Sequence, residues 1–158
     1  LASMLEVNRS LSYLCLARND ITDKGCQAIA KSMKENKYLK KLDLSSNYLE
    51  DASVKALASM LRESHTLLHL DLANNRIGDD GGIPLAHALK VNNTLMYLNV
   101  RQNDMRVAGE HLAETLRKNN SILVLDFSYN NFSYKSYSYI MEALKRNQDL
   151  FKAAAGEG

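Results

Sequence analysis

The sequence predicts a single α/β domain, a solenoid with a parallel β-sheet on its concave face and α-helices on its convex face. Two observations predict it. A short pattern of leucines and one asparagine recurs at a nearly fixed period, and an amphipathic helical segment follows each copy. A fixed period of about 20 to 50 residues is typical of solenoids, because each repeat can bury its apolar face only against its neighbours.

The clearest copy of the pattern is residues 39–49, with the sequence LKKLDLSSNYL, which follows L-x-x-L-x-L-x-x-N-x-L. Copies begin at residues 11, 39, 67, 95 and 122, and Leu150 opens a sixth copy that the sequence does not finish. Successive beginnings are 28, 28, 28, 27 and 28 residues apart, so five copies agree in phase over nearly the whole chain.

Within each copy apolar and exposed positions alternate, as at Leu42, Asp43 and Leu44, and this predicts a short strand buried on one face. Where the backbone turns out of each strand, its N–H and C=O groups lose their strand partners. An asparagine side chain donates and accepts at once. We therefore expect a ladder of asparagines that links the repeats. Its members are Asn19, Asn47, Asn75, Asn103 and Asn130.

A helix is expected after each ladder residue, because pairs of apolar residues four apart share one helical face. The pairs are Ile29/Met33, Leu57/Leu61, Leu85/Leu89, Leu112/Leu116 and Ile140/Leu144. Candidate N-caps are Asp23, Asp51 and Asp79. The helices are expected to end near Asn36, Ser64, Asn92, Asn119 and Asn147.

Two copies depart from the rule. In the third copy, Pro84 requires the helix to begin late or to tolerate a proline in its first turn. In the fourth copy, Leu112 follows the ladder residue Asn103 by nine residues, whereas the other copies have ten. One residue is therefore missing between ladder and helix.

The ends of the chain fall inside repeats. Residues 1–5, LASML, recur as residues 57–61 two periods later, so the first residues are expected to be helical. We expect residues 1–152 to form one domain of about five repeats with partial ends, cut from a longer array, and residues 153–158 to lie outside the pattern. Neither end shows the capping motif that solenoids usually need, so frayed ends are expected.

Composition narrows the function classes. The formal net charge is +2 with mixed signs, which argues against nucleic-acid binding, and no apolar run is long enough for a membrane span. Cys15 and Cys26 lack the spacing of a zinc site and are expected to be free thiols. N-x-[ST] occurs at residues 8, 92, 119 and 131, but the first three share a repeat phase, which favours polar turns over glycosylation.

With strand, ladder and helix in hand, the repeat resembles the ribonuclease-inhibitor-like class of leucine-rich repeats. The resemblance lies in the Asn-x-Leu, the following Asp and Gly, and the Leu-Ala…Leu helix. The class includes the sensor regions of NOD-like receptors, the Ran GTPase-activating protein and the C-terminal part of tropomodulin. It implies a cytoplasmic α/β horseshoe that binds proteins on its concave face. The longer repeats and frequent cysteines of ribonuclease inhibitor are missing, so ribonuclease inhibition is not implied.

Exposed strand positions form rows across the predicted sheet. The first row offers aromatic and basic groups that suit binding hot spots, and the second row is mostly acidic. The predicted partner-binding residues are Tyr13, Lys41, His69, Tyr97, Asp43, Asp71, Asn99, Arg101, Asp126 and Tyr129. An equally open interpretation is that the acidic row is solvated and that its aspartates only fit the turn beside the ladder.

The partner is expected to be another protein. We expect no catalysis, no cofactor and no small-molecule substrate. An open curved sheet does not exclude water from its surface, as an active site would. A single histidine, His69, beside carboxylates is a poor set of metal ligands. The alternative is a GTPase-activating or cytoskeletal (actin) regulatory segment of a larger protein. The GTPase-activating role is considered because Arg76 and Arg106 follow the ladder in exposed loops. The last copy also carries Tyr134, Tyr137 and Tyr139, either as a second interface or as partly packed surface.

Overall fold

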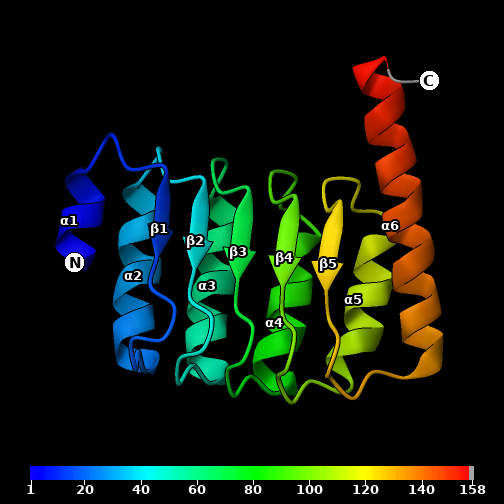
Figure 1. Cartoon of the computed structure of the whole chain (residues 1–158), viewed down its shortest axis with the longest axis horizontal. Helices are drawn as coiled ribbons and strands as arrows, with labels where there is room; N and C mark the ends of the chain where they lie inside the picture. The colour runs from blue at the N-terminus through cyan, green and yellow to red at the C-terminus, as the bar shows by residue number, and fades with distance from the viewer. Residues whose placement is uncertain (157–158) are drawn as a thin grey trace.

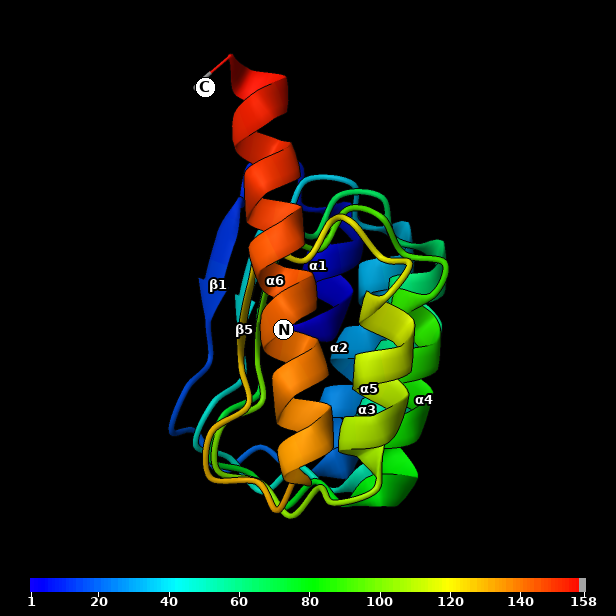
Figure 2. The ribbon, with the colours of Figure 1, turned by 90° about the vertical axis from the view of Figure 1, so that its right-hand side faces the viewer.

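The computed structural model describes residues 1–156 and has two layers, a parallel β-sheet and a row of α-helices behind it (Figures 1 and 2). The five strands lie in the sheet in chain order, and every neighbouring pair is parallel. The strands are β1 Tyr13–Cys15, β2 Lys41–Asp43, β3 His69–Asp71, β4 Tyr97–Asn99 and β5 Val124–Asp126. The predicted α/β solenoid is therefore confirmed.

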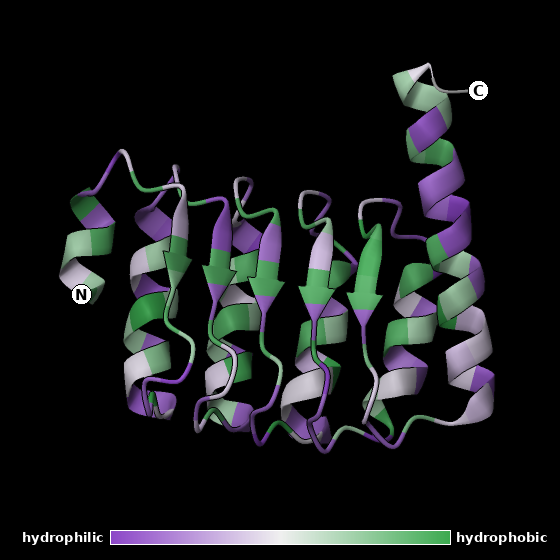
Figure 3. Cartoon of the chain, in the orientation of Figure 1, coloured by the Kyte–Doolittle hydropathy of each residue, from purple (hydrophilic) through white to green (hydrophobic). Residues whose placement is uncertain are grey.

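The strand register reproduces the sequence period. Leu42 pairs with Leu70, and Asp43 pairs with Asp71, so equivalent positions of consecutive repeats lie side by side. In each strand the central leucine points into the core while its neighbours face solvent, which mixes hydrophilic and hydrophobic colours along the arrows of β1 to β4 (Figure 3). The alternation follows from the period-two geometry of a strand.

The helices run antiparallel to the strands and bury one face against the sheet and against their neighbours. They are α1 Ala2–Val7, α2 Asp23–Glu35, α3 Asp51–Glu63, α4 Asp79–Leu89, α5 Ala108–Leu116 and α6 Tyr134–Ala155. All five predicted apolar pairs are buried, and they join the strand leucines in one continuous core. α5 begins five residues after its ladder asparagine, whereas α2, α3, α4 and α6 begin four residues after theirs. The connection in the fourth copy is therefore longer by one residue, and the shortening falls at the start of the helix rather than between ladder and helix.

The ladder asparagines bridge consecutive repeats. The Asn75 side-chain oxygen accepts hydrogen bonds from the backbone N–H of Asn47 at 3.2 Å and of Leu49 at 3.1 Å, both in the preceding repeat. Its amide donates to the carbonyl of Leu44, also in that repeat, at 3.2 Å and to that of Leu72 at 3.0 Å. Each turn thus satisfies backbone groups that no strand partner reaches.

A second series of side chains bridges the repeats at the opposite edge, where helices lead into strands. The Asn92 amide donates to the carbonyls of Leu61 and Ser64 at 2.8 and 3.1 Å, and the Asn119 amide donates to those of Leu89 and Asn92 at 2.8 and 2.9 Å. Both asparagines are buried. Their amides are therefore structural, as the shared repeat phase predicts, and closed to glycosylation.

The predicted N-caps are wrong in detail. Asp51 and Asp79 stand at the first helical position, and the N-cap residues of these helices are Glu50 and Gly78. The Asp51 carboxylate instead accepts from the backbone N–H groups of Gly78 and Gly81 at 2.7 and 3.0 Å, at the start of the next helix. Each of these aspartates therefore caps the helix of the following repeat.

The same cross-repeat capping explains the start of the last helix. Asp23 caps α3 through the N–H groups of Glu50 and Ser53, and Asp79 caps α5 through those of Arg106 and Ala108. The fourth repeat carries Val107 at the equivalent position and cannot cap α6.

α6 supplies its own cap: the Ser133 hydroxyl accepts from the backbone N–H of Ser136 at 3.1 Å. A helix whose preceding repeat lacks the aspartate therefore carries a local N-cap serine.

The sixth strand expected at Leu150 does not form. α6 continues through Asn147, where an end was expected, to Ala155, and residues 153–155 of the expected tail belong to it. Gly156 is the C-cap of α6, and residues 157–158 of that tail lie outside the described residues. Asn147 lies at the repeat position near which the earlier helices end, but in α6 it is buried within the helix, and the residues after it remain helical and exposed.

α6 also packs against the C-terminal end of the core, an end that was expected to fray because it lacks a capping motif. In the side view it lies in front of the core, between the sheet and the helix layer (Figure 2). The Asn147 amide donates to the carbonyl of Ile122 at 2.8 Å, and the Gln148 amide donates to that of Leu123 at 2.8 Å. These carbonyls precede β5, where a further repeat would otherwise bind.

Pro84 fits neither expected arrangement. α4 begins at Asp79, so the proline is the sixth helical residue rather than part of the first turn. A proline there removes one helical N–H donor. The helix continues past it and buries Leu85 and Leu89, so packing against the neighbouring repeats maintains it.

Candidate functional site

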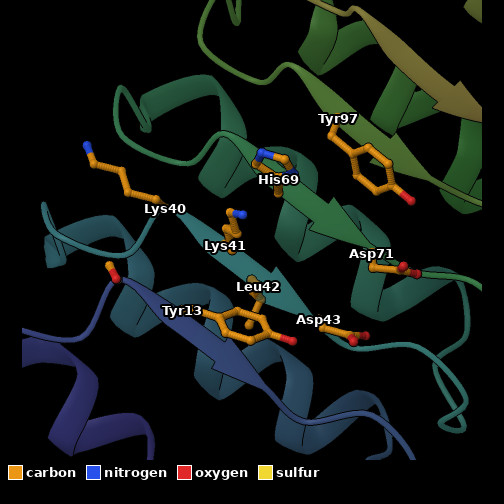
Figure 4. Close-up of a pocket in the computed structure, with 9 residues that line it drawn as sticks. Tyr13, Lys40, Lys41, Leu42, Asp43, His69, Asp71 and Tyr97 are labelled. Atoms are coloured by element: carbon orange, nitrogen blue, oxygen red, sulfur yellow. The ribbon is translucent and has the colours of Figure 1, made fainter.

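The solvent side of β1 to β5, called the strand face below, carries a hollow of about 600 Å³ over its first four strands. Tyrosines stand at its two sides, lysines at the beginning of the strands and aspartates at their ends (Figure 4). It is lined by Ser12, Tyr13, Lys40, Lys41, Leu42, Asp43, His69, Asp71 and Tyr97. Six of the predicted partner-binding residues are thus brought together: Tyr13, Lys41, His69, Tyr97, Asp43 and Asp71.

The first row gives the hollow its aromatic walls. The imidazole of His69 stacks on the Tyr97 ring, with centroids 5.4 Å apart and an interplanar angle of 23°. Tyr13 stands two strands away from His69 and is 53% exposed. The Tyr13 ring extends toward Asp43 in Figure 4. Exposed aromatic rings on an otherwise polar face are the kind of group that forms binding hot spots.

The acidic row has a structural task as well. The Oδ1 atom of Asp43 accepts from the backbone N–H of Ser45 at 2.9 Å, and that of Asp71 accepts from Ala73 at 2.9 Å. Asp126 makes the same bond to the residue two positions later, and so does the uncharged Asn99, at 3.0 Å in both cases. A turn-forming role therefore explains an Asx residue in this row, but it does not require the negative charge.

The second oxygens of these carboxylates remain on the side of the hollow. Oδ2 of Asp71 accepts from the Asn99 amide at 3.0 Å, and Oδ2 of Asp43 lies 3.4 Å from the Cys15 sulfur, whose thiol donates to it. Among residues 1–156 neither carboxylate forms an ion pair within 4.0 Å. Both charges are thus available to a bound group.

The carboxylates of Asp43 and Asp71 place negative charge at the ends of β2 and β3. Partial burial raises the pKa of Asp71 above its usual range, and the charges of Asp43 and Asp126 add to the effect. Burial also raises the pKa of Tyr97, with Asp71 and Asp126 contributing. The pKa of Tyr13 is raised first by a hydrogen bond with the Cys15 side chain and further by the nearby carboxylates.

The beginning of β2 carries positive charge, because Lys40 and Lys41 stand there. Burial lowers the pKa of His69, and the ammonium of Lys41 lowers it further. His69 is therefore neutral at pH 7 and serves the hollow as an aromatic surface. Lys40, which the sequence analysis did not select, also lines the hollow because it lies directly before β2. Its position immediately before a predicted strand was the available signal.

The other predicted residues lie outside the hollow. The guanidinium of Arg101 sits 4.7 Å from the centroid of the Tyr129 ring, and Tyr129 is 71% exposed. Tyr129 has a positive φ of 55°, as do the residues at the same repeat position in the other copies. Those residues are Arg18, Ser46, Asn74 and Gln102. The side-chain direction at this repeat position is therefore set by a left-handed backbone turn that the sequence pattern did not indicate.

The loop arginines are engaged within the chain. The guanidinium of Arg76 lies 4.8 Å from the centroid of the Tyr48 ring, and that of Arg106 pairs with Asp104 at 3.3 Å. Both arginines that suggested a GTPase-activating role therefore contact groups of their own chain, although the pair of Arg106 and Asp104 is exposed.

The last repeat divides its aromatic residues between core and surface. Phe127 is buried and stacks on Phe132 at 5.6 Å. Tyr137 packs edge-on against Phe127 at 5.3 Å and remains 50% exposed, while Tyr134 is 86% exposed. The two phenylalanines thus fill the core.

Other chemistry is limited in the described part of the chain. Cys15 is exposed and Cys26 buried, and both are free thiols, as predicted. Burial raises the pKa of Cys26 to about 12, so this thiol is unreactive. No group of three or more His, Cys, Asp or Glu side chains in residues 1–156 could hold a metal ion. In the same residues, no helix combines the length and apolar character that crossing a bilayer requires.

The family scan matches the sequence period directly. A family described as "Leucine Rich repeat" matches residues 7–30, 35–58 and 63–86. The chain has the fold of a leucine-rich repeat solenoid, and the family model matches its first three repeats. A search of the curated proteins gave no match. The resemblance to the ribonuclease-inhibitor-like class is confirmed as far as the repeat and its α-helix define that class.

Solved structures show the same fold. A leiomodin-1 structure titled actin-binding site 2 superposes with a TM-score of 0.86 at 20% identity, over 98% of this chain and 91% of that one. The tropomodulin C-terminal domain of Caenorhabditis elegans gives 0.86 at 15% identity, over 99% and 96%. The leucine-rich repeat domain of Mex67 from Chaetomium thermophilum gives only 0.54 at 16% identity, over 89% and 97%. The first two leucine-rich repeat domains therefore share the whole arrangement of repeats with this chain.

Proposed function

We propose that this leucine-rich repeat domain is a non-catalytic protein-binding module that holds its partner on the strand face. The hollow over β1 to β4 is the observation that carries the proposal. It gathers two tyrosines, a stacked histidine and both signs of charge on a surface where the core needs none of them. Aromatic and charged residues in a concave surface favour protein recognition.

The proposed site is tested by two captures from cell lysate. One uses the chain itself, and the other uses a variant with Lys41, His69, Tyr97 and Tyr129 changed to alanine. Lys41, His69 and Tyr97 lie on the strand face and Tyr129 lies in the exposed turn after β5, so none of the four belongs to the core or to the asparagine ladder. Loss of a specific partner only from the variant supports the proposal. Equal capture by both proteins would move the site to the helix layer or to the last repeat.

A matched control removes an exposed group from the helix layer instead. Lys55 is exposed on α3, on the opposite side from the sheet face, and Lys55→Ala is expected to capture the same partner as the unchanged chain. Circular dichroism and thermal unfolding of all three proteins show whether they fold alike. Any partner so identified is then measured directly, by calorimetry with the purified pair.

Actin is the specific partner that a structural observation favours. The leiomodin-1 domain with the same arrangement of repeats is titled an actin-binding site, and it superposes over 98% of this chain. Co-sedimentation with actin filaments and pyrene-actin polymerisation, each with and without this domain, test the proposal. Unchanged polymerisation together with absence from the pellet would reject actin and leave the general binding proposal standing.

The GTPase-activating alternative has less support, because Arg76 and Arg106 both bind groups of their own chain. A cytoplasmic location is supported by the two free thiols, which suit a reducing compartment.

A further inference from the structure

The hollow on the strand face has a charge direction. Lys40 and Lys41 stand where β2 begins, and Asp43 and Asp71 stand where β2 and β3 end. The formal charges of the nine lining residues sum to zero with His69 neutral, so the hollow as a whole favours neither a cation nor an anion. It favours a group that carries both charges in the matching order.

The spacing of the two charges matches an extended peptide. Lys41 and Asp43 are two residues apart on one strand, and side chains at i and i+2 point to the same face about 6.6 Å apart. A bound segment in extended conformation has the same spacing between alternate side chains. Its residues i and i+2 can therefore lie over the lysines and the aspartates at the same time.

The walls suit such a segment. Tyr13 on one side and the stacked pair of Tyr97 and His69 on the other offer flat rings to the stem of a long side chain. A guanidinium is attracted by a tyrosine ring and by a carboxylate together. The negative ends of the strands hold both groups, since Asp43 and Asp71 are paired in register beside the Tyr13 and Tyr97 rings.

We propose that the hollow binds an extended protein segment that presents an acidic and a basic side chain two residues apart. The acidic side chain lies over Lys40 and Lys41, and the basic side chain, preferably arginine, lies over Asp43 and Asp71. This inference rests on the proposed function, because it describes what the strand face recognises in its protein partner. The segment can run in either direction, since only the placement of the two charges is fixed.

The test uses four short peptides as probes, each acetylated and amidated. They are Ala-Glu-Ala-Arg-Ala, Ala-Arg-Ala-Arg-Ala, Ala-Glu-Ala-Glu-Ala and the neutral Ala-Gln-Ala-Gln-Ala. Binding is followed by NMR shifts of the His69 and Tyr97 ring signals and of the β2 and β3 amides at low ionic strength. The mixed-charge peptide is expected to bind about 3- to 10-fold more tightly than any other, because each like-charged peptide places one charge beside its own sign.

Two variants make the test specific. In Lys41→Glu, Lys40 is the one positive charge left in the hollow. The order of peptide affinities is therefore expected to change, and the double-arginine peptide is expected to bind best. Lys41 is exposed, so folding is not at risk. Lys55→Glu makes the same charge change on the helix layer and is expected to leave the order unchanged.

Asp71→Asn removes one negative charge and keeps the turn, because Asn99 makes the equivalent bond in the next repeat. It is expected to weaken the mixed-charge peptide about 2- to 5-fold.

The proposal is overturned if the neutral peptide binds as well as the mixed-charge peptide, or if Lys41→Glu leaves the order of affinities unchanged. Absence of shifts from all four peptides at millimolar concentration overturns it too. These outcomes are distinct from failure of the proposed function. If the alanine variant loses the partner in the capture experiment but the peptides show no charge preference, the proposed function stands and only the peptide proposal is rejected.

Discussion

The carboxylate of Asp51, in the first turn of α3, accepts a hydrogen bond at 2.7 Å from the backbone N–H of Gly78, which precedes α4. Donor and acceptor thus belong to helices of different repeats. A helix begins with unsatisfied N–H groups, and in this chain the preceding repeat satisfies them. The helices are therefore capped only when the repeats are stacked.

Removing this carboxylate is expected to destabilise the fold. Asp51→Ala leaves the N–H groups of Gly78 and Gly81 without their acceptor, and urea unfolding is expected to show a loss of about 1 to 2 kcal/mol. Asp80→Ala is the matched control, since Asp80 is exposed in the first turn of α4. Equal losses in the two variants would show that only the charge near the helix start matters.

Two glycines at one repeat phase are expected to respond differently to alanine. A Cβ on Gly81 would lie 2.9 Å from an oxygen of Asp51 and 3.0 Å from the Asp51 Cα, which cannot move aside. Gly81→Ala is therefore expected to cost about 1 to 3 kcal/mol of unfolding free energy.

A Cβ on Gly25 would meet only the Ile21 side chain, at 3.2 Å, so Gly25→Ala is expected to be nearly neutral or to gain helix propensity. Thermal unfolding of both variants compares them. A similar shift in Tm for the two would contradict the packing argument.

The asparagine ladder can be tested with adjacent residues. The Asn130 amide donates to the carbonyls of Val100 and Phe127 at 2.8 and 3.2 Å, whereas Asn131 is exposed beside it. Asn130→Ala leaves buried acceptors unpaired and is expected to cost about 1 to 3 kcal/mol. Asn131→Ala is expected to cost less than about 0.5 kcal/mol. Chemical denaturation measures the unfolding free energy of both variants. A larger loss in Asn131→Ala than in Asn130→Ala would contradict the assignment of Asn130 to the ladder.

The hollow predicts a pH response at His69. Burial and the Lys41 ammonium hold the His69 pKa below its ordinary value of 6.5, and the unfolded chain lacks both effects. As pH falls below 6.5, the unfolded state takes up this proton first, so the contribution of neutral His69 to stability is present above that pH and is lost below it.

Changing the neighbouring charge tests the cause. In Lys41→Ala the His69 pKa is expected to rise toward 6.5 without reaching it, because burial is the larger cause and remains. NMR titration of the imidazole protons measures the pKa in both proteins. Lys55→Ala, on the helix layer, is expected to leave it unchanged. A lower His69 pKa in Lys41→Ala would refute the electrostatic account.

Much of the site followed from the repeat phase. Because the period becomes the strand register, Tyr13, Lys41, His69 and Tyr97 had to lie in one row, and Asp43 had to lie beside Asp71. What the period could not show is that the first four strands enclose a hollow. Phase places residues in rows, but hollowness depends on ring orientations such as the stacking of His69 on Tyr97.

The partners of individual polar groups were less accessible to sequence analysis. The three aspartates after the ladder are good N-cap residues by type, and this suggested caps for their own helices. The structure sets each carboxylate against the next repeat instead, as with Asp79 and Ala108 at 2.8 Å. A local rule failed because a solenoid brings residues about one period apart as close as sequence neighbours.

The sequence by itself determined the repeat, the alternation of strands and helices, the parallel register and the rows of the strand face. It could do so because a period of 28 residues forces equivalent positions into contact. Only the tertiary structure decided how the chain ends, how the helices are capped and where the strand face is hollow. The part of α6 up to Asn147 buries its apolar face against the end of the core, a packing that arises from the stacked repeats rather than from any local signal.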